Sequence, residues 1–253
     1  MTRRRFYAPP EAFAPDGASV VLSEEESRHL RDVLRLRAGD EAFVFDGEGR
    51  EFACVVRGVG GRAAALEVRG RVPSPSPESP LELTLAVALL KGEKFDLVVQ
   101  KATELGAARV LPVETKRSDV RLRDRADAAR RVGRWRRLAL EASKQSGRAR
   151  VPAVAEPTRL ESLVAGAGAA GELRLLFAER GGAALDSLSA EGGRGPAAVT
   201  ALVGPEGGWD DEEVALARGG GWTVVTLGGR TLRAETAAVA VTALLQHLFG
   251  DLK

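Results

Sequence analysis

The sequence predicts an α/β fold for most of the chain, preceded by a small β-rich domain. After residue 81, aliphatic and β-branched strands alternate with helical stretches, a pattern typical of a largely parallel sheet. Two strand–glycine–helix units follow one another near the end, at 198–213 and 223–249. A stretch rich in proline and serine at 73–80 separates the two parts, because such a sequence forms a stiff spacer rather than a strand.

Residues 1–72 are predicted to form a small barrel of short strands with one helix. Apolar residues at 43–45 and 52–56 flank a glycine-containing turn and indicate a hairpin, and 63–68 adds a further strand. The helix is expected over 27–34, with Ser23 as its N-cap and Glu26 three residues later.

The second part begins with strands and helices of ordinary length and ends with two glycine-rich turns. Strands are expected at 81–90, 110–113, 173–177, 198–203 and 223–227, and helices at 94–105, 126–145 and 235–249. Gly106 ends the first of these helices. A further helix starts at Asp210, which is paired with Glu213 in the spacing of a capping box.

The glycine-rich turns indicate a ligand site at the carboxyl edge of the sheet. Glycines let a ligand approach bare backbone, and the turns that follow parallel strands meet at one edge. A dinucleotide fingerprint is disfavoured, since no G-x-G-x-x-G follows a strand. A P-loop is excluded, because the chain has no Gly-Lys-Ser/Thr.

Charge and composition narrow the class of partner. The 253 residues carry a net charge of +2, but residues 109–150 hold 14 basic and five acidic side chains. This block predicts either phosphate binding or a solvated helix face, and Trp135 among arginines favours RNA. One cysteine and two histidines predict neither disulfides nor a metal site. Without a membrane-spanning run or a secretory signal, we expect a cytoplasmic protein.

Several motifs resemble one known family. They are HLRDVLRLRAGD at 29–40, KATELGAARVLPVETKRSDVR at 101–121, EASKQSGR at 141–148, GPEGG at 204–208 and LGGRTLRAETA at 227–237. Together, and in this order, they resemble the 16S ribosomal RNA uracil-N3 methyltransferases of the SPOUT superfamily. The resemblance extends over nearly the whole chain. Two departures from the family pattern are Ala234, where a hydroxyl is usual, and Thr231, where an aliphatic residue is usual.

The resemblance implies a fold and an activity. It implies a PUA-like RNA-binding barrel at 1–72, a linker at 73–80 and a trefoil-knotted methyltransferase domain at 81–253. The knot rests on the resemblance alone, since knots are rare. The implied enzyme is a homodimer without a metal that uses S-adenosyl-L-methionine. Its implied partner is 16S ribosomal RNA or the small ribosomal subunit, and its reaction is methylation of a uridine N3.

The resemblance also assigns site residues. The cofactor set is Phe177, Ala178, Leu202, Val203, Gly204, Gly207, Leu227, Gly228, Leu232, Ala234 and Thr236. Because uridine N3 must lose a proton, Arg233 is expected to stabilise charge developing at O2 or O4. Glu206 or Glu235 is expected either to act as general base or to cap a helix or orient Arg233.

The RNA contacts are expected from the barrel and from the basic block together. The residues are Arg3, Arg4, Arg5, His29, Arg35, Arg121 and Arg148. His29 has an equal alternative as an ordinary surface histidine. A rival hypothesis is an RNA-binding protein that keeps the fold and has lost the chemistry. The intact set of glycine loops argues against it.

Overall fold

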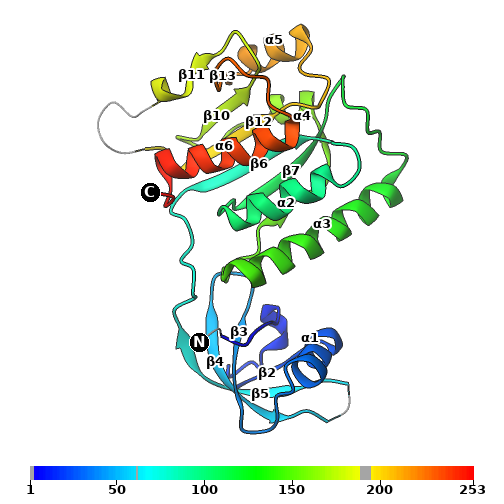
Figure 1. Cartoon of the computed structure of the whole chain (residues 1–253), viewed down its shortest axis with the longest axis vertical. Helices are drawn as coiled ribbons and strands as arrows, with labels where there is room; N and C mark the ends of the chain where they lie inside the picture. Colours follow the sequence, from blue (N-terminus) through cyan, green and yellow to red (C-terminus); the bar gives the residue numbers. More distant parts are fainter. Residues whose placement is uncertain (1–2, 61, 189–194) are drawn as a thin grey trace. The chain divides into compact units, whose positions relative to one another are not determined.

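The computed structural model describes residues 3–60, 62–188 and 195–253, and the chain divides into two compact units (Figure 1). Unit 1 consists of Met1–Glu78 and Leu140–Val151, and unit 2 of Ser79–Ala139 and Pro152–Lys253. The domain bounds predicted from the sequence are continuous, whereas the structure packs 140–151 with the first unit. Backbone hydrogen bonds explain the difference, because Val151 N donates to Gly47 O at 2.9 Å and Gly49 N to Ala149 O at 3.1 Å.

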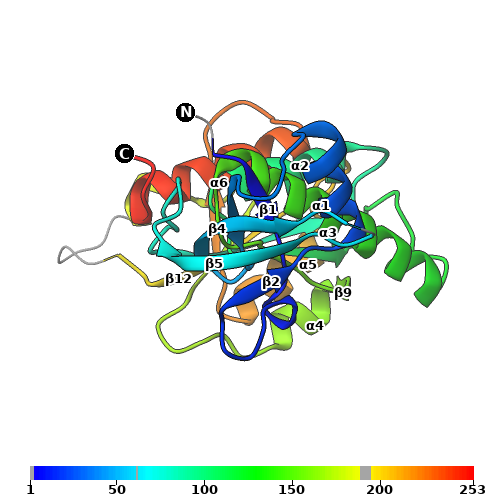
Figure 2. The same cartoon turned by 90° about the horizontal axis from the view of Figure 1, so that it is seen from below.

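Unit 1 is built on a mostly antiparallel sheet, part of which Figure 2 shows from below. The strand order is β1-β3-β4-β5-β2, and only the pair β1–β3 is parallel within the described ranges. The strands are β1 (Arg5–Tyr7), β2 (Ser19–Val21), β3 (Glu41–Phe45), β4 (Glu51–Gly58) and β5 (Ala65–Val72). The predicted hairpin is therefore present as β3 and β4.

One helical segment covers the core of unit 1. It consists of α1 (Glu24–Arg28) and a π-helical turn, η2 (His29–Val33), and a short 3-10 helix, η1 (Pro10–Ala12), precedes them. The Ser23 side chain accepts from Glu26 N at 3.2 Å, so the predicted N-cap is present. Leu30 packs with Phe6, Val44 and Leu66 in the core, and all four are fully buried.

Unit 2 contains a parallel sheet with the order β11-β13-β10-β12-β6-β7-β8, and β9 also pairs with β7. Every described strand pair in it is parallel. The strands are β6 (Glu82–Ala88), β7 (Arg109–Glu114), β8 (Ala153–Val154), β9 (Thr158–Arg159), β10 (Leu173–Phe177), β11 (Ala183–Ala184), β12 (Ala198–Val203) and β13 (Thr223–Thr226).

Helices cover both faces of this sheet. They are α2 (Lys94–Glu104), α3 (Arg125–Ser146, whose last turns belong to unit 1), α4 (Leu160–Ala165), α5 (Asp211–Gly219) and α6 (Ala234–Phe249). Leu202 packs with Leu160 of α4 and Ala217 of α5. Because side chains alternate along a strand, Val203 faces the other side, where α6 contacts β12 and α2 contacts α6.

The long basic helix differs from the prediction in one respect. Trp135, expected among RNA-facing arginines, is only 3% exposed. Its ring lies 4.2 Å from that of Phe95, and its Nε1 donates to Asp96 Oδ1 at 3.0 Å. The tryptophan therefore attaches α3 to α2 and is not available to RNA.

Short elements between 151 and 188 were not predicted. They include α4, β8, β9, β11 and the 3-10 helix η3 (Leu185–Leu188). Two-residue strands are too short to show an alternating pattern. Within the described ranges, no helix is both long and apolar enough to cross a membrane.

Candidate active site

A cavity of about 340 Å³ lies at the carboxyl ends of β10, β12 and β13. Phe177 and Ala178 end or follow β10, Val203 and Gly204 end or follow β12, and Leu227 follows β13. The other lining residues are Lys94, Glu179, Pro205, Glu206, Gly208, Trp209, Gly228, Arg230, Thr231, Leu232, Arg233, Ala234 and Ala237. Parallel sheets bind ligands at this edge, so the cavity lies where the sequence predicted a site.

Most of the predicted cofactor residues meet in this cavity. Eight of the eleven line it, and Leu202, Gly207 and Thr236 do not. Leu202 points away because it alternates with Val203 and is buried against α4 and α5. Gly207 faces Arg117, whose carbonyl oxygen would lie 3.0 Å from a Cβ at residue 207. Thr236 is exposed on the first turn of α6.

Trp209 shapes the wall of the cavity and was not predicted. Its indole Nε1 donates to Phe177 O at 2.8 Å, which joins the GPEGG loop to the end of β10. A Cβ on residue 204 would lie 2.9 Å from Trp209 Cε2 and 3.0 Å from its Nε1. Gly204 is therefore required to make room for the indole, whereas the sequence suggested that it makes room for a ligand.

Residues of the basic block hold this loop from outside the cavity. Arg117 donates to Trp209 O at 2.9 Å and to Asp210 Oδ2 at 3.2 Å. The buried carboxylate of Glu213 accepts from Lys116 N at 2.8 Å and from Asp210 N at 3.0 Å, the latter as half of the predicted capping box. Lys116 and Arg117 thus fix the loop to the segment after β7.

Glu206 is held by two lysines at the edge of the cavity. Its Oε1 accepts from Lys94 Nζ at 3.1 Å and from Lys91 N at 3.3 Å. Burial would raise the pKa of Glu206, but hydrogen bonds from its own backbone amide, from Lys94 and from Lys91 N, with the charge of Lys94, hold that pKa below its ordinary value. A carboxylate with a lowered pKa is a weak base near neutral pH.

Two arginines of the LGGRTLRAETA loop line the cavity and, unlike Glu206, have no ion-pair partner among the described residues. Arg230 and Arg233 are both exposed, and neither forms an ion pair with any described residue. Glu235, on the first turn of α6, does not line the cavity, and its Oε2 lies 3.8 Å from Lys94 Nζ. That oxygen accepts no hydrogen bond from the part of the chain that the structure describes.

Some of the cavity residues that the prediction missed could have been identified from the sequence, and others could not. Trp209 and Arg230 lie inside or directly beside the motifs, so the loops themselves could have indicated them. Lys94 starts a helix more than a hundred residues before the GPEGG loop, and no local pattern connects the two. Among the described residues, no group of His, Cys, Asp and Glu is arranged to hold a metal ion.

Unit 1 contains a second cavity, of about 960 Å³. The predicted RNA contacts Arg3, Arg4, Arg5 and His29 line it together with residues 144–147 at the end of α3. The structure therefore brings Arg3–Arg5, here called the arginine arm, and part of the EASKQSGR motif into one site, although they lie far apart in sequence.

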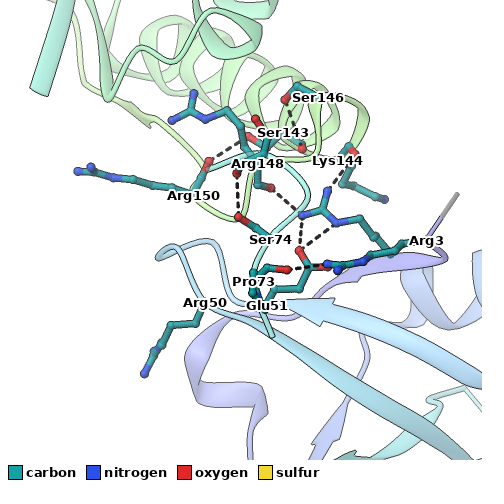
Figure 3. Close-up of polar contacts among 12 residues, drawn as sticks. Arg3, Arg50, Glu51, Pro73, Ser74, Ser143, Lys144, Ser146, Arg148 and Arg150 are labelled. Carbon is teal, nitrogen blue, oxygen red and sulfur yellow. Dashed lines mark hydrogen bonds and ion pairs between the residues drawn. The ribbon is translucent and has the colours of Figure 1, made fainter. Parts of the chain in front are cut away.

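Two of these arginines are bound within the unit, as Figure 3 shows for Arg3. Arg3 donates to Glu51 Oε1 at 3.2 Å and to Pro73 O at 2.6 Å. Arg5 donates to Glu51 Oε2 at 2.9 Å and to the carbonyl oxygens of Lys144 and Arg148 at 3.1 and 2.9 Å. Arg4 is exposed and forms no ion pair with the described residues.

The other predicted RNA contacts do not line this cavity. Arg148 (labelled in Figure 3) is 3% exposed, and its guanidinium binds Glu78 Oε2 at 2.7 Å, so burial removes it as a phosphate contact. Arg121 donates to the carbonyl oxygens of Thr115 and Lys116 at 2.8 Å. Arg35 is exposed and has a φ of 54°, apart from both cavities.

The chain is similar to known proteins over its whole length. An RNA methyltransferase domain family matches residues 77–246, and an RNA methyltransferase PUA domain family matches 22–69. Ribosomal RNA small subunit methyltransferase E of Synechocystis sp. is 34% identical over 91% of this chain and 74% of its own length. The protein of the same name from Mycobacterium bovis is 33% identical over 88% and 85%.

Two solved structures match the whole chain. Ribosomal RNA small subunit methyltransferase E from Neisseria gonorrhoeae, bound to S-adenosyl methionine, is 32% identical with a TM-score of 0.86, and all of both chains is covered. A protein of Legionella pneumophila in complex with the same cofactor gives the same values.

The fold and the cavity at the strand ends define an RNA methyltransferase with an N-terminal PUA domain, as the family matches show. The likeness to full-length relatives then narrows the class. The chain belongs to the ribosomal RNA small subunit methyltransferase E family. The trefoil knot remains a prediction.

Proposed function

We propose that this chain transfers a methyl group from S-adenosyl-L-methionine to N3 of one uridine in 16S ribosomal RNA. The observation that carries the proposal is the cavity formed by the three loops after β10, β12 and β13. The relative from Neisseria gonorrhoeae, which is 32% identical to this chain and has the same fold, binds S-adenosyl methionine.

The residues present fit this cofactor. Phe177, Val203 and Leu227 provide apolar walls for a flat adenine ring, and the volume of about 340 Å³ lies within the range of small-molecule pockets. Gly228 has a φ of 115°, a conformation that residues with a side chain rarely adopt. It therefore presents bare backbone to the cavity. When bound, the cofactor supplies a methyl group on a positively charged sulfonium, which needs no metal to activate it.

Arg233 is the residue that we assign to the uridine. Attack through N3 requires loss of its proton, which passes to solvent water, and negative charge is then shared by O2 and O4. A guanidinium stabilises that charge without changing its own protonation. Arg233 suits this role because it lines the cavity, is exposed and has no ion-pair partner among the described residues.

The two glutamates are less suited to act as general base. Glu206 has a lowered pKa and is bound by Lys94, so we assign it to fixing the loop against α2. Glu235 lies outside the cavity lining and near the same lysine. We therefore favour stabilisation of an imide anion by Arg233 over proton removal by either carboxylate.

RNA binding is assigned to the cavity of unit 1 and to exposed arginines near the active site. Arg4 and Arg230 are free to bind phosphates, since neither forms an ion pair with the described residues. Arg3 and Arg5 are already bound to Glu51 and shape the cavity instead. We place this activity in the cytoplasm, where a substrate of ribosomal RNA would be found.

We further propose a homodimer that uses the outer face of α6. Leu244 is 37% exposed and lines an apolar groove of about 440 Å³ with Leu185 and Leu248. Leu227 and Gly228 line both this groove and the active-site cavity, so a second copy seated here would stiffen the cofactor loop. Light scattering on a Leu244→Glu variant should give half the wild-type mass. An unchanged mass would rule out this face of α6 as the dimer interface.

The catalytic proposal is tested with purified chain, 16S ribosomal RNA that lacks the modification, and labelled cofactor. Nuclease digestion and mass spectrometry should find one 3-methyluridine. Label at a different atom, or none at all, would contradict the proposal. Thermal unfolding with millimolar cofactor separates the rival hypothesis, because an RNA-binding protein without chemistry would show no rise in melting temperature.

A further inference from the structure

The cavity of unit 1 is formed by segments that are distant in sequence. The arginine arm, the helical segment from Glu25 to Leu34 and the end of α3 each contribute to it. Figure 3 labels three of its lining residues, Lys144 and Ser146 at the end of α3 and Arg3 near the N-terminus. The helical segment turns π-helical at His29–Val33, where Leu34 N donates to His29 O at 3.0 Å. Such turns occur frequently at functional sites.

A buried carboxylate in this cavity has one oxygen without a donor. Glu26 is 6% exposed, and its Oε1 accepts from Lys144 Nζ at 2.7 Å. Its Oε2 accepts no hydrogen bond from any described residue. An unsatisfied buried acceptor destabilises the folded state, so native chains rarely keep one without a partner. Because Glu26 lines the cavity, a rotation of its carboxylate would present this buried oxygen to a ligand that brings an N–H group.

Lys144 is held in its charged form beside Glu26. Burial would lower the pKa of Lys144, but the hydrogen bonds and charges of Glu26 and Glu141 raise it above its ordinary value. The cavity therefore presents a carboxylate acceptor directly beside an ammonium donor. A phosphate would be repelled by the carboxylate, whereas a base edge carrying adjacent donor and acceptor groups would match both.

Guanine matches this pair best among the four bases. Its O6 accepts, and its adjacent N1–H and N2–H₂ donate, so Lys144 can donate to O6 while Glu26 accepts from the two N–H groups. Uracil offers only one donor on that edge. The exposed Arg4 lines the same cavity and is available to the phosphate of the same nucleotide.

We propose that the cavity of unit 1 binds an unstacked guanine of the RNA, read by Glu26 and Lys144, with Arg4 on its phosphate. The inference rests on the proposed function, because it takes RNA as the substrate. Single-stranded and looped RNA is commonly recognised through splayed bases of this kind. The site would select the sequence near the target uridine, and the cavity of unit 2 would perform the chemistry.

The first test uses the wild-type chain and fluorescence anisotropy with short oligouridines. One oligonucleotide carries a central guanosine, a second carries inosine, which lacks the N2 amino group, and a third carries uridine only. We expect the guanosine oligonucleotide to bind about tenfold more tightly than the uridine one, with inosine between them. Equal affinity for all three would overturn the proposal.

The second test compares Glu26→Gln with Glu24→Gln. Both changes remove one negative charge from α1, but Glu24 is 57% exposed and does not line the cavity. Glu26→Gln should lose the guanosine preference and raise KM for ribosomal RNA at unchanged kcat, whereas Glu24→Gln should keep both. A preference retained by folded Glu26→Gln would refute the assignment, and if that variant does not fold, the wild-type comparison with inosine decides.

These readouts separate this inference from the proposed function. Methylation of ribosomal RNA by wild type without any guanosine preference would refute only the guanine site. A guanosine preference without methylation would refute only the proposed reaction.

Discussion

The packing of Trp209 against Gly204 makes Gly204→Ala the most informative single change in the active site. The added Cβ would lie 2.9 Å from Trp209 Cε2, 3.0 Å from Nε1 and 3.3 Å from Cδ2. The indole cannot shift freely, because its Nε1 donates to Phe177 O at 2.8 Å. The variant must therefore either strain the loop or break this hydrogen bond.

The expected magnitude follows from these contacts. Overpacking of a methyl group costs about 1–3 kcal/mol, and a lost hydrogen bond about 1 kcal/mol. We expect the free energy of unfolding to fall by about 2 kcal/mol. Because Trp209 lines the cavity, cofactor affinity should fall about tenfold, which corresponds to about 1.4 kcal/mol.

A double-mutant cycle with Trp209→Phe tests the cause. The phenyl ring is smaller and lacks the Nε1–H that fixes the indole to Phe177, so it can move away from residue 204, and Gly204→Ala should cost less in that background. Denaturant unfolding and calorimetric titration of the cofactor would measure a coupling free energy of about 1–2 kcal/mol. Equal effects of Gly204→Ala in both backgrounds would show that the methyl group clashes with something other than Trp209.

Four further predictions concern charged residues. Arg233→Ala should lower the methyl-transfer rate about a hundredfold, with cofactor affinity nearly intact, and normal turnover at saturating RNA would remove it from the mechanism. The folded chain lowers the pKa of Glu206, so its pair with Lys94 stabilises the fold at pH values above the ordinary pKa of a glutamate, and this stabilisation is lost as pH falls through the lowered pKa. Glu206→Gln should therefore reduce the loss of melting temperature in acid. An unchanged dependence of melting temperature on pH in acid would contradict the pairing. Arg148→Ala should destabilise unit 1 by about 3 kcal/mol, because it leaves a carboxylate without its partner. Arg4→Ala should leave stability unchanged and reduce the salt dependence of RNA binding by about one unit of slope. If instead Arg4→Ala lowered stability and Arg148→Ala reduced the salt dependence, Arg148 would be the RNA contact and Arg4 the structural residue.

Features that depend on a few neighbouring residues were predictable. The Ser23 cap and the Asp210–Glu213 capping box are present as expected, because each depends on a spacing of three residues. Gly106 follows α2 with a φ of 85°, as a helix-ending glycine should. The ends of β10, β12 and β13 meet at the predicted edge, since parallel strands align their carboxyl ends.

The roles of individual charges were not predictable. The sequence shows Arg5 and Arg148 in basic surroundings, but Glu51 and Glu78, which bind them, lie 46 and 70 residues away. No local pattern distinguishes an arginine that is bound to a distant carboxylate from one that is free. For this reason the burial of Arg148 against Glu78 was not foreseen, and the same limit hid the binding of Glu206 by Lys94.

The sequence determined the class of fold, the position of the ligand loops and the family, because strand alternation, capping and motif order are all recorded along the chain. Only the tertiary structure decided which side chains of those loops face the cavity, why residue 204 must be glycine, and which arginines stay exposed. These properties depend on contacts between residues that are far apart in sequence. Trp209 reaching Phe177 and Glu26 reaching Lys144 are contacts of this kind, and packing alone brings them together.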